Sequence, residues 1–223
     1  MMFSKLKSCG LLGIDGFVVE VEADISNGIP AFEIVGLADT AIRESKERVR
    51  SAIKNAGLEF PVRRITMNLA PANLKKVGSS FDLAIALGIL AATEQVTGPL
   101  LTQCIFVGEL SLDGEIRPIH GVLPIAVSAM QSGAACLVLP EANAKEAAVV
   151  RGLKILPVKS LSEAVRHFNG QQPLETLTGG QMDIFNGKID YAEDFSDVKG
   201  QENVKRALEV AASGAHNCIM LGY

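Results

Sequence analysis

The spacing of apolar and polar positions predicts that the chain opens with β-strands. In residues 17–25 (FVVEVEADI), apolar side chains fall on every second position, which is typical of a strand with one buried face. A Gly-Ile-Asp-Gly turn at 13–16 precedes this strand, and the Asn27-Gly28 pair predicts a turn after it. Residues 31–37 (AFEIVGL) then form another apolar run. We therefore expect an antiparallel meander of about three strands.

After residue 37, the spacing of apolar residues changes from the two-residue period of a strand to that of a helix. Asp39 or Thr40 is placed to cap a helix that runs to about Ala56 and ends before Gly57. Ile42, Val49, Ile53 and Ala56 recur at helical spacing and predict its buried stripe.

Residues 74–90 (LKKVGSSFDLAIALGIL) open with two lysines, turn at Gly78 and then run into a second predicted helix, whose apolar positions between Leu83 and Leu90 leave almost no polar face. Such a helix belongs at the centre of a domain. Ser79 and Ser80 stand at its start, where a serine is either an N-cap or a nucleophile. We expect the cap, with Asp82 stabilised by the positive end of the helix dipole.

The remaining pattern alternates between strands and helices up to Phe168. Strands are predicted at 62–70, 105–112, 115–119, 136–139 and 154–157, with a hairpin turn at Asp113-Gly114, and helices at 121–132, 142–150 and 161–168. This indicates a mixed α/β domain over residues 1–168.

Residues 169–192 are polar, rich in glycine and without sustained periodicity, so they are interpreted as a linker. A helix at 202–213 and a strand at 217–221 follow. We expect a second domain to start at residue 193 and to be cut off at Tyr223.

The net charge of −4 conceals a basic segment. Between Asp39 and Lys76 there are nine Lys and Arg against four Asp and Glu, a local charge of +5. Such a segment faces nucleic acid, an acidic neighbouring subunit, or simply solvent. The candidate contact residues for nucleic acid are Arg43, Lys46, Arg50, Lys54, Arg63, Arg64, Lys75 and Lys76. We expect Lys75 and Lys76 to be exposed.

Other sequence signals narrow the class of protein. Cys9, Cys104, Cys136 and Cys218 are widely separated, so they indicate neither a zinc site nor a disulfide framework, and no metal site is predicted. No run reaches the ~20 apolar residues of a membrane span, and the first residues lack a signal peptide. We expect a cytoplasmic protein with no membrane partner.

Several stretches together resemble known families. GSSFDLAIALGIL, VGELSLDGEIRPIHGVLPIA and LVLPEANAKEA resemble the proteolytic domain of Lon-type proteases. The similarity is closer to the ComM/YifB group of magnesium-chelatase-like AAA+ ATPases, through VGLADTAIRESKERVRSAI, NLAP and DFSDVKGQENVKRALEVAASGAHN. The resemblance implies a Lon-protease-like (ribosomal protein S5 domain 2-like) fold, followed by a linker and the first helix and strand of an AAA+ P-loop domain.

The Lon resemblance places Ser80 at the nucleophile position and Leu123 at the position of the catalytic lysine. A serine–lysine mechanism needs an amine that accepts the hydroxyl proton, which leucine cannot do. Phe81 and Asp82 also replace a small Ala-Gly pair. The site is therefore expected to be degenerate, with no catalytic residue. His120 is a further possible base, although it is more often structural without an aligned acid.

The ATPase resemblance places Val198, Lys199, Gly200 and Gln201 in the region that cradles adenine. It implies that the full-length protein uses ATP and Mg²⁺, whereas no P-loop lysine follows Gly222 here and no cofactor is expected to bind this part alone.

The same resemblance implies a homo-oligomer, a hexamer when full-length, that drives branch migration of DNA in recombination and natural transformation. Contacts with branched or single-stranded DNA would be independent of sequence. Two alternatives stay open: a Ser80-dependent Lon-like peptidase, and the motor subunit of a magnesium-chelatase-type complex. Whether this part is itself an enzyme is left undecided.

Overall fold

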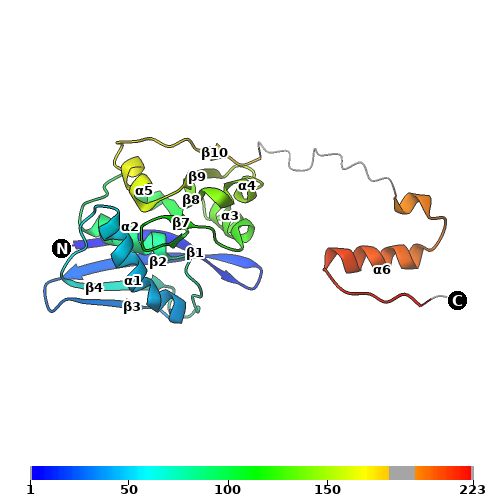
Figure 1. The fold of residues 1–223 in the computed structure, drawn as a ribbon, viewed down its shortest axis with the longest axis horizontal. Helices are drawn as coiled ribbons and strands as arrows, with labels where there is room; N and C mark the ends of the chain where they lie inside the picture. The colour runs from blue at the N-terminus through cyan, green and yellow to red at the C-terminus, as the bar shows by residue number, and fades with distance from the viewer. Residues whose placement is uncertain (1, 181–193, 222–223) are drawn as a thin grey trace. The chain divides into compact units, whose positions relative to one another are not determined.

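The computed structural model describes residues 2–180 and 194–221, which divide into two compact units between residues 183 and 184. The first unit is built on one mixed sheet of eight strands, in the order β10-β9-β8-β5-β1-β2-β4-β3 (Figure 1). The α/β class with a mixed sheet is therefore confirmed. The strands are β1 (Met2–Leu12), β2 (Asp15–Ser26), β3 (Ala31–Val35), β4 (Arg64–Ala70), β5 (Cys104–Phe106), β8 (Cys136–Pro140), β9 (Lys154–Val158) and β10 (Leu177–Thr178).

The first two strands form the predicted antiparallel hairpin, in a register that runs from Met2 opposite Ile25 to Leu12 opposite Asp15. The predicted three-stranded meander is wrong at its third member. β4 pairs with β2 in antiparallel orientation, and β3 lies outside β4 and parallel to it. Helix α1 (Thr40–Asn55) connects β3 to β4, because a parallel pair requires a crossover rather than a tight turn.

Helices cover both faces of this sheet. α2 (Asp82–Ala92) and α5 (Leu161–Phe168) pack on one face together with α1, while α3 (Val122–Gln131) and the short α4 (Ala144–Ala147) pack on the other. Alternate residues of the central strands supply the two cores: Cys104 and Phe106 face the first, and Ile105 faces the second.

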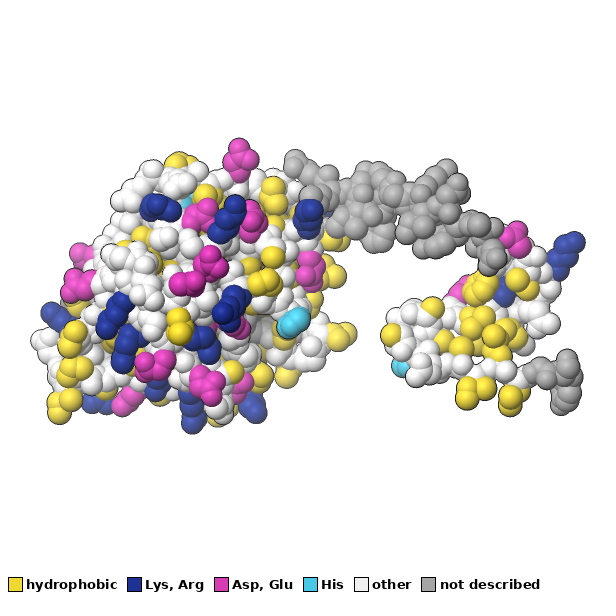
Figure 2. All heavy atoms as spheres, viewed as in Figure 1, with side chains coloured by type: hydrophobic (Ala, Val, Ile, Leu, Met, Phe, Trp, Pro, Cys, Tyr) yellow, Lys and Arg dark blue, Asp and Glu magenta, His cyan; other side chains and the backbone are white. Residues whose placement is uncertain are grey.

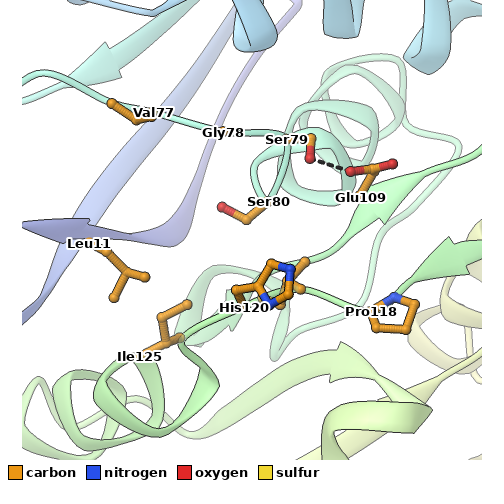
Figure 3. A pocket seen from close by; sticks show the side chains of 10 residues that line it. Leu11, Val77, Gly78, Ser79, Ser80, Glu109, Pro118, His120 and Ile125 are labelled. Atoms are coloured by element: carbon orange, nitrogen blue, oxygen red, sulfur yellow. Dashed lines mark hydrogen bonds between the residues drawn. The ribbon is translucent and has the colours of Figure 1, made fainter. Parts of the chain in front are cut away.

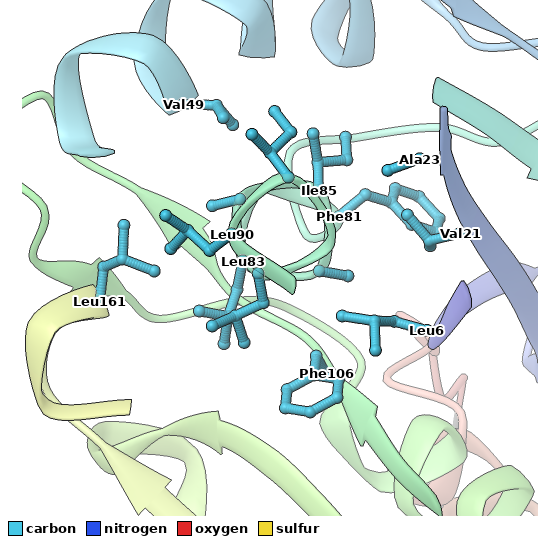
Figure 4. Packing of buried hydrophobic residues seen from close by; sticks show 14 of the residues in the cluster. Leu6, Val21, Ala23, Val49, Phe81, Leu83, Ile85, Leu90, Phe106 and Leu161 are labelled. Carbon is cyan, nitrogen blue, oxygen red and sulfur yellow. The ribbon is translucent and has the colours of Figure 1, made fainter. Parts of the chain in front are cut away.

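α2 is the centre of the first core, as its apolar sequence predicts. Its residues from Asp82 to Leu90 are all buried. Figure 4 shows the helix end-on, surrounded by Val49 of α1, Val21 of β2, Phe106 of β5 and Leu161 of α5. A helix without a polar face is stable only when it is covered on all sides, and these four elements supply the cover.

Two other predicted elements differ from the structure. The strand expected at 105–112 is divided, because the chain turns at Gly108 and residues 109–110 leave the main sheet. They form a small hairpin of β6 (Glu109–Leu110) and β7 (Ile116–Arg117) around the predicted Asp113-Gly114 turn. The helix expected at 142–150 is reduced to the 3₁₀ turn Glu141–Asn143 and α4.

Part of the segment predicted as a linker belongs to the sheet, since β10 pairs antiparallel with β9 through Leu177 and Thr178. Residues 181 to 192 of that predicted linker lie outside the described residues.

The second unit contains the predicted helix, α6 (Glu202–Ser213), after the 3₁₀ turn Phe195–Asp197. The strand expected at 217–221 is wrong, as these residues form no regular structure. A strand needs a hydrogen-bonded neighbour, and within the described part of this unit none pairs with it.

No helix in residues 2–180 or 194–221 combines the length and the apolar character that crossing a membrane requires.

Candidate functional site

The serine turn lies where α1, α2 and the β6–β7 hairpin meet. The peptide groups of this turn bond to the bend between β5 and β6: the N–H of Gly108 donates to Ser80 O at 2.8 Å, and the N–H of Leu83 donates to Gly108 O at 3.1 Å. The predicted serine cap is therefore wrong. Phe81 occupies the N-cap position without a side-chain bond, and the Gly108 carbonyl takes a first-turn N–H that a serine would have capped.

A hollow of ≈ 280 Å³ opens beside this turn. Figure 3 shows Ser80 and His120 at the hollow, while Ser79 turns toward Glu109. The hydroxyl of Ser79 donates a short hydrogen bond to the Glu109 carboxylate, which also lies 3.4 Å from Arg117. Glu109 is thus engaged by a serine and an arginine, and Ser80 is the hydroxyl that faces the space.

The residue at the lysine position lies elsewhere. Leu123 is 42% exposed and lines a different hollow, together with Ile14 and Gly16 at the tip of the β1–β2 hairpin. None of the ten residues that line the Ser80 hollow is a lysine. No lysine amine at the hollow could therefore accept the proton of Ser80. Among the lining residues, His120 is the one with a ring nitrogen that can act as a base.

A buried ion pair holds the turn against α1. The carboxylate of Asp82 is 1% exposed and accepts two bonds from Arg48, at 2.7 Å from Nε and 3.1 Å from Nη2. The N–H of Leu110 donates to the same carboxylate at 3.3 Å. Burial raises the pKa of Asp82 to about 6, although Arg48 opposes the shift. The hydrogen bond with Asp82 in turn raises the pKa of Arg48.

Sequence reasoning missed this pair. It treated Asp82 as a helix-dipole residue and assigned Arg48 no role. Two signals could have identified it: Asp82 is the only charged residue in an otherwise apolar helix, and Arg48 stands next to Val49 of the buried stripe.

Asp39 connects the same parts of the structure. Of the two predicted caps, Asp39 or Thr40, it is Asp39 that caps α1: its carboxylate accepts from Ile42 N at 2.9 Å and also from Gly78 N at 3.1 Å. Gly78 has φ +93°, a conformation that favours glycine, so the turn can reach the cap without strain.

The predicted basic surface is divided by the structure. Arg43, Lys54, Arg63, Arg64 and Lys75 are exposed, and Lys46 and Arg50 are half-buried. Arg64 lies 3.5 Å from Glu33, which neutralises part of its charge. Figure 2 shows Lys and Arg side chains interspersed with Asp and Glu on the visible face, so the face as a whole is mixed in sign.

The expectation that Lys76 is exposed is wrong. Its exposed fraction is 0%, and its amine donates to the carbonyls of Gly36, at 2.9 Å, and Pro71. Burial lowers the pKa of Lys76. Gly36 has φ +101°, and a Cβ there would lie 2.1 Å from Leu69 O, so the loop after β3 packs too closely for any other residue. Lys76 joins two loops and does not reach a ligand on the surface.

In the second unit, the predicted adenine-region residues Val198, Lys199, Gly200 and Gln201 are exposed. They lie between the 3₁₀ turn, which is closed by a capping box of Asp194 and Asp197, and the start of α6. No group of three or more His, Cys, Asp or Glu suited to a metal ion occurs in the described residues of either unit.

Comparisons of the chain with known proteins show which family it belongs to. The family described as "Subunit ChlI of Mg-chelatase" matches residues 21–143, more than half of the chain. The chain belongs to this ChlI family. A second family, "Magnesium chelatase, subunit ChlI", matches residues 194–223, in the second unit.

Individual relatives agree with this assignment. The chain is 42% identical to the competence protein ComM of Haemophilus influenzae over 95% of its length, and 38% identical to the protein YifB of Escherichia coli over 100% of its length. It spans only 42% and 43% of those relatives, less than half of each. The Lon protease of Trichlorobacter lovleyi is more distant, 25% identical over 69% of the chain and 20% of the protease. The chain is thus a ComM/YifB-like member of an AAA+ family, with weaker similarity to Lon protease.

Proposed function

We propose that the whole protein is an ATP-dependent DNA motor of the AAA+ class, and that its first unit is a non-proteolytic domain that contacts DNA. Similarity to a competence protein over 95% of the chain supports a role in DNA uptake or recombination, with branch migration as the reaction. In this proposal, residues 1–168 form the Lon-like domain, 169–192 the linker, and residues from 193 onward begin the ATPase module.

The observation that supports this proposal best is the contrast between the serine turn and the basic residues. The Ser80 hollow contains no lysine, whereas several cations of the basic segment stay exposed on α1 and before β4. Exposed Lys and Arg side chains bind phosphates without reading sequence, as a motor that moves along DNA requires.

The proposal extends to cofactor and assembly. The whole protein would bind ATP and Mg²⁺, with Val198 to Gln201 near the adenine, and would act as a hexamer in the cytoplasm. The match of residues 194–223 to a chelatase subunit family supports a nucleotide-binding module there.

The test uses the full-length protein and a synthetic four-way DNA junction. We expect ATP hydrolysis to rise when the junction is added, and the junction to be resolved into two duplexes only with ATP. A protein that neither binds the junction nor hydrolyses ATP faster in its presence would contradict the proposal.

A second candidate is the motor subunit of a magnesium-chelatase-type complex, which the names of both matching families favour. It predicts that partner chelatase subunits, rather than DNA, stimulate ATP hydrolysis. The same assay with both additions separates the two candidates.

The Ser80-dependent peptidase is tested with a serine-reactive phosphonate probe. Because the hollow offers no amine, we expect no labelling of the wild-type chain. Labelling that disappears in Ser80→Ala would instead establish Ser80 as a reactive serine.

A further inference from the structure

The C-terminal half of α1 and the segment before β4 enclose a second hollow, of ≈ 250 Å³, on the first unit. Arg50 and Lys54 reach it from α1, where they are four residues apart and so share a helix face. Arg63 reaches it from the segment before β4. None of the eight lining residues is Asp or Glu, so the hollow concentrates positive charge.

Among the described residues, Glu47 is the one acid that forms an ion pair with these three cations, and it does not cancel their charge. Glu47 lies 3.7 Å from Arg50, but the two side chains are 74% and 40% exposed, and ion pairs this exposed to water are weak. Arg63 donates to the neutral amide of Asn27 at 3.3 Å. Neither Lys54 nor Arg63 forms an ion pair with a described residue.

The hollow is also held in shape. The guanidinium carbon of Arg50 lies 5.3 Å from the ring centre of Phe60, and Phe60 packs at 5.9 Å against the ring of Phe32. A guanidinium placed over an aromatic ring loses little further freedom on binding, and its planar fork of N–H groups matches a phosphate.

An apolar rim adjoins the cations. Val62 is 81% exposed, and Pro30 and Pro61 also line the hollow. A duplex keeps its bases stacked inside and presents only sugar and phosphate to such a rim. An unpaired strand can turn a base onto apolar side chains while its phosphate contacts the cations.

We propose that this hollow binds a phosphodiester of single-stranded nucleic acid, with Arg50, Lys54 and Arg63 on the phosphate and Val62 against the adjoining unpaired base. The inference rests on the proposed function and gives it a defined contact site. It also separates these three cations from Arg43, Lys46, Arg64 and Lys75, which do not line the hollow.

The test measures fluorescence anisotropy of a short labelled oligothymidylate with the chain, over a salt series from about 50 to 200 mM. Arg50→Gln with Lys54→Gln removes two of the three cations on this phosphate, so we expect affinity to fall about tenfold and the slope of log affinity against log salt to decrease by at most about 0.7. Val62→Ser keeps the charge, and we expect it to reduce the preference for single strand over duplex by about threefold.

The matched control is Arg43→Gln with Lys75→Gln, which removes the same charge from exposed positions outside the hollow. We expect it to lower affinity by less than about threefold. Arg63→Gln, on a different segment, replaces the double variant if thermal unfolding shows that the double variant is not folded.

The outcomes separate this inference from the proposed function. An equal loss of affinity in the control and the hollow variants would overturn the hollow as the binding site. The proposed DNA-binding function would still stand. Equal affinity for duplex and single strand, or equal competition by polyglutamate, would overturn the single-strand specificity. A full-length protein that binds no DNA would overturn both.

Discussion

The Ser80 hollow and the basic hollow at Arg50, Lys54 and Arg63 lie beside opposite ends of helix α1. They differ in how their charged groups are paired. Near the N-terminal end of α1, the polar groups of the serine turn are paired with one another: Ser79 with Glu109, Asp82 with Arg48, and Gly78 with the Asp39 cap. Near the C-terminal end, Lys54 and Arg63 have no ion-pair partner among the described residues.

This difference shows how a catalytic position becomes structural. A nucleophile needs a base that is free to take its proton, whereas the carboxylates of Asp39, Asp82 and Glu109 around the serine turn are engaged in holding parts of the chain together. A binding surface needs charges that are free in the unbound state. The comparison therefore predicts that substitutions near the serine turn change stability and those at the basic hollow change binding.

Arg48→Ala should have the largest effect on stability. It leaves the Asp82 carboxylate buried without its cation, and we expect the free energy of unfolding to fall by about 3 to 5 kcal/mol. Urea unfolding at pH 7 measures the change. Arg43→Ala on the exposed side of the same helix is the control and should stay within about 0.5 kcal/mol of wild type. If Arg48→Ala lowered the free energy of unfolding no more than the control does, the Arg48–Asp82 pair would not be what holds the turn.

The raised pKa of Asp82 should appear as a pH dependence of stability. Because the folded pKa of about 6 exceeds the ordinary 3.8, the folded state binds this proton more tightly than the unfolded state. This tighter proton binding contributes fully to the free energy of unfolding below about pH 4. The contribution, up to about 3 kcal/mol, is lost as pH rises through about 6.

Asp82→Asn cannot titrate and should lack this component. Urea unfolding of both proteins between pH 4 and 7 measures it as a difference. Parallel pH profiles for wild type and Asp82→Asn would contradict this prediction, because they would show that the Asp82 carboxyl has the same pKa in the folded and the unfolded chain.

Lys76→Met keeps the length of a buried side chain but removes its donors. The carbonyls of Gly36 and Pro71 lose their partner, and we expect a destabilisation of about 1 to 3 kcal/mol with no direct effect on DNA contact. The adjacent exposed Lys75→Met should leave thermal unfolding unchanged. If Lys75→Met proved the more destabilising of the two, the burial of Lys76 would be wrong.

The smallest expected difference is between the two serines. Ser79→Ala breaks the bond to Glu109 and should cost about 1 kcal/mol, whereas Ser80→Ala should cost less than about 0.5 kcal/mol. Thermal unfolding of the two variants side by side makes the comparison. A larger cost for Ser80→Ala would assign the structural role to that hydroxyl instead.

Local pattern predicted most of the elements of the first unit. The β1–β2 hairpin, α1 with its Asp39 cap, the buried α2, and the small hairpin at Asp113-Gly114 follow from spacing and turn chemistry over a few residues. The position of β3 did not follow, because the partner of a strand depends on a residue range more than thirty positions away. The strand expected at 217–221 failed for the same reason, since pairing is not a local property.

The candidate site shows the same division. Sequence identified the serine turn, the leucine at the lysine position and the basic segment as a set. It did not separate Lys76, whose amine is buried between two loops, from the exposed Lys75 next to it. It also missed the Arg48–Asp82 pair, whose members are thirty-four residues apart in the chain.

The sequence by itself determined most of the helices and strands of the first unit, which helix is central, and that positive charge is concentrated between Asp39 and Lys76, because periodicity and composition act locally. The tertiary structure alone decided which of those charges are free. Burial and pairing depend on what the fold brings beside each side chain. In the folded chain Asp82 pairs with Arg48 and Lys76 donates to two carbonyls, whereas Lys54 and Arg63 line one hollow and form no ion pair with a described residue.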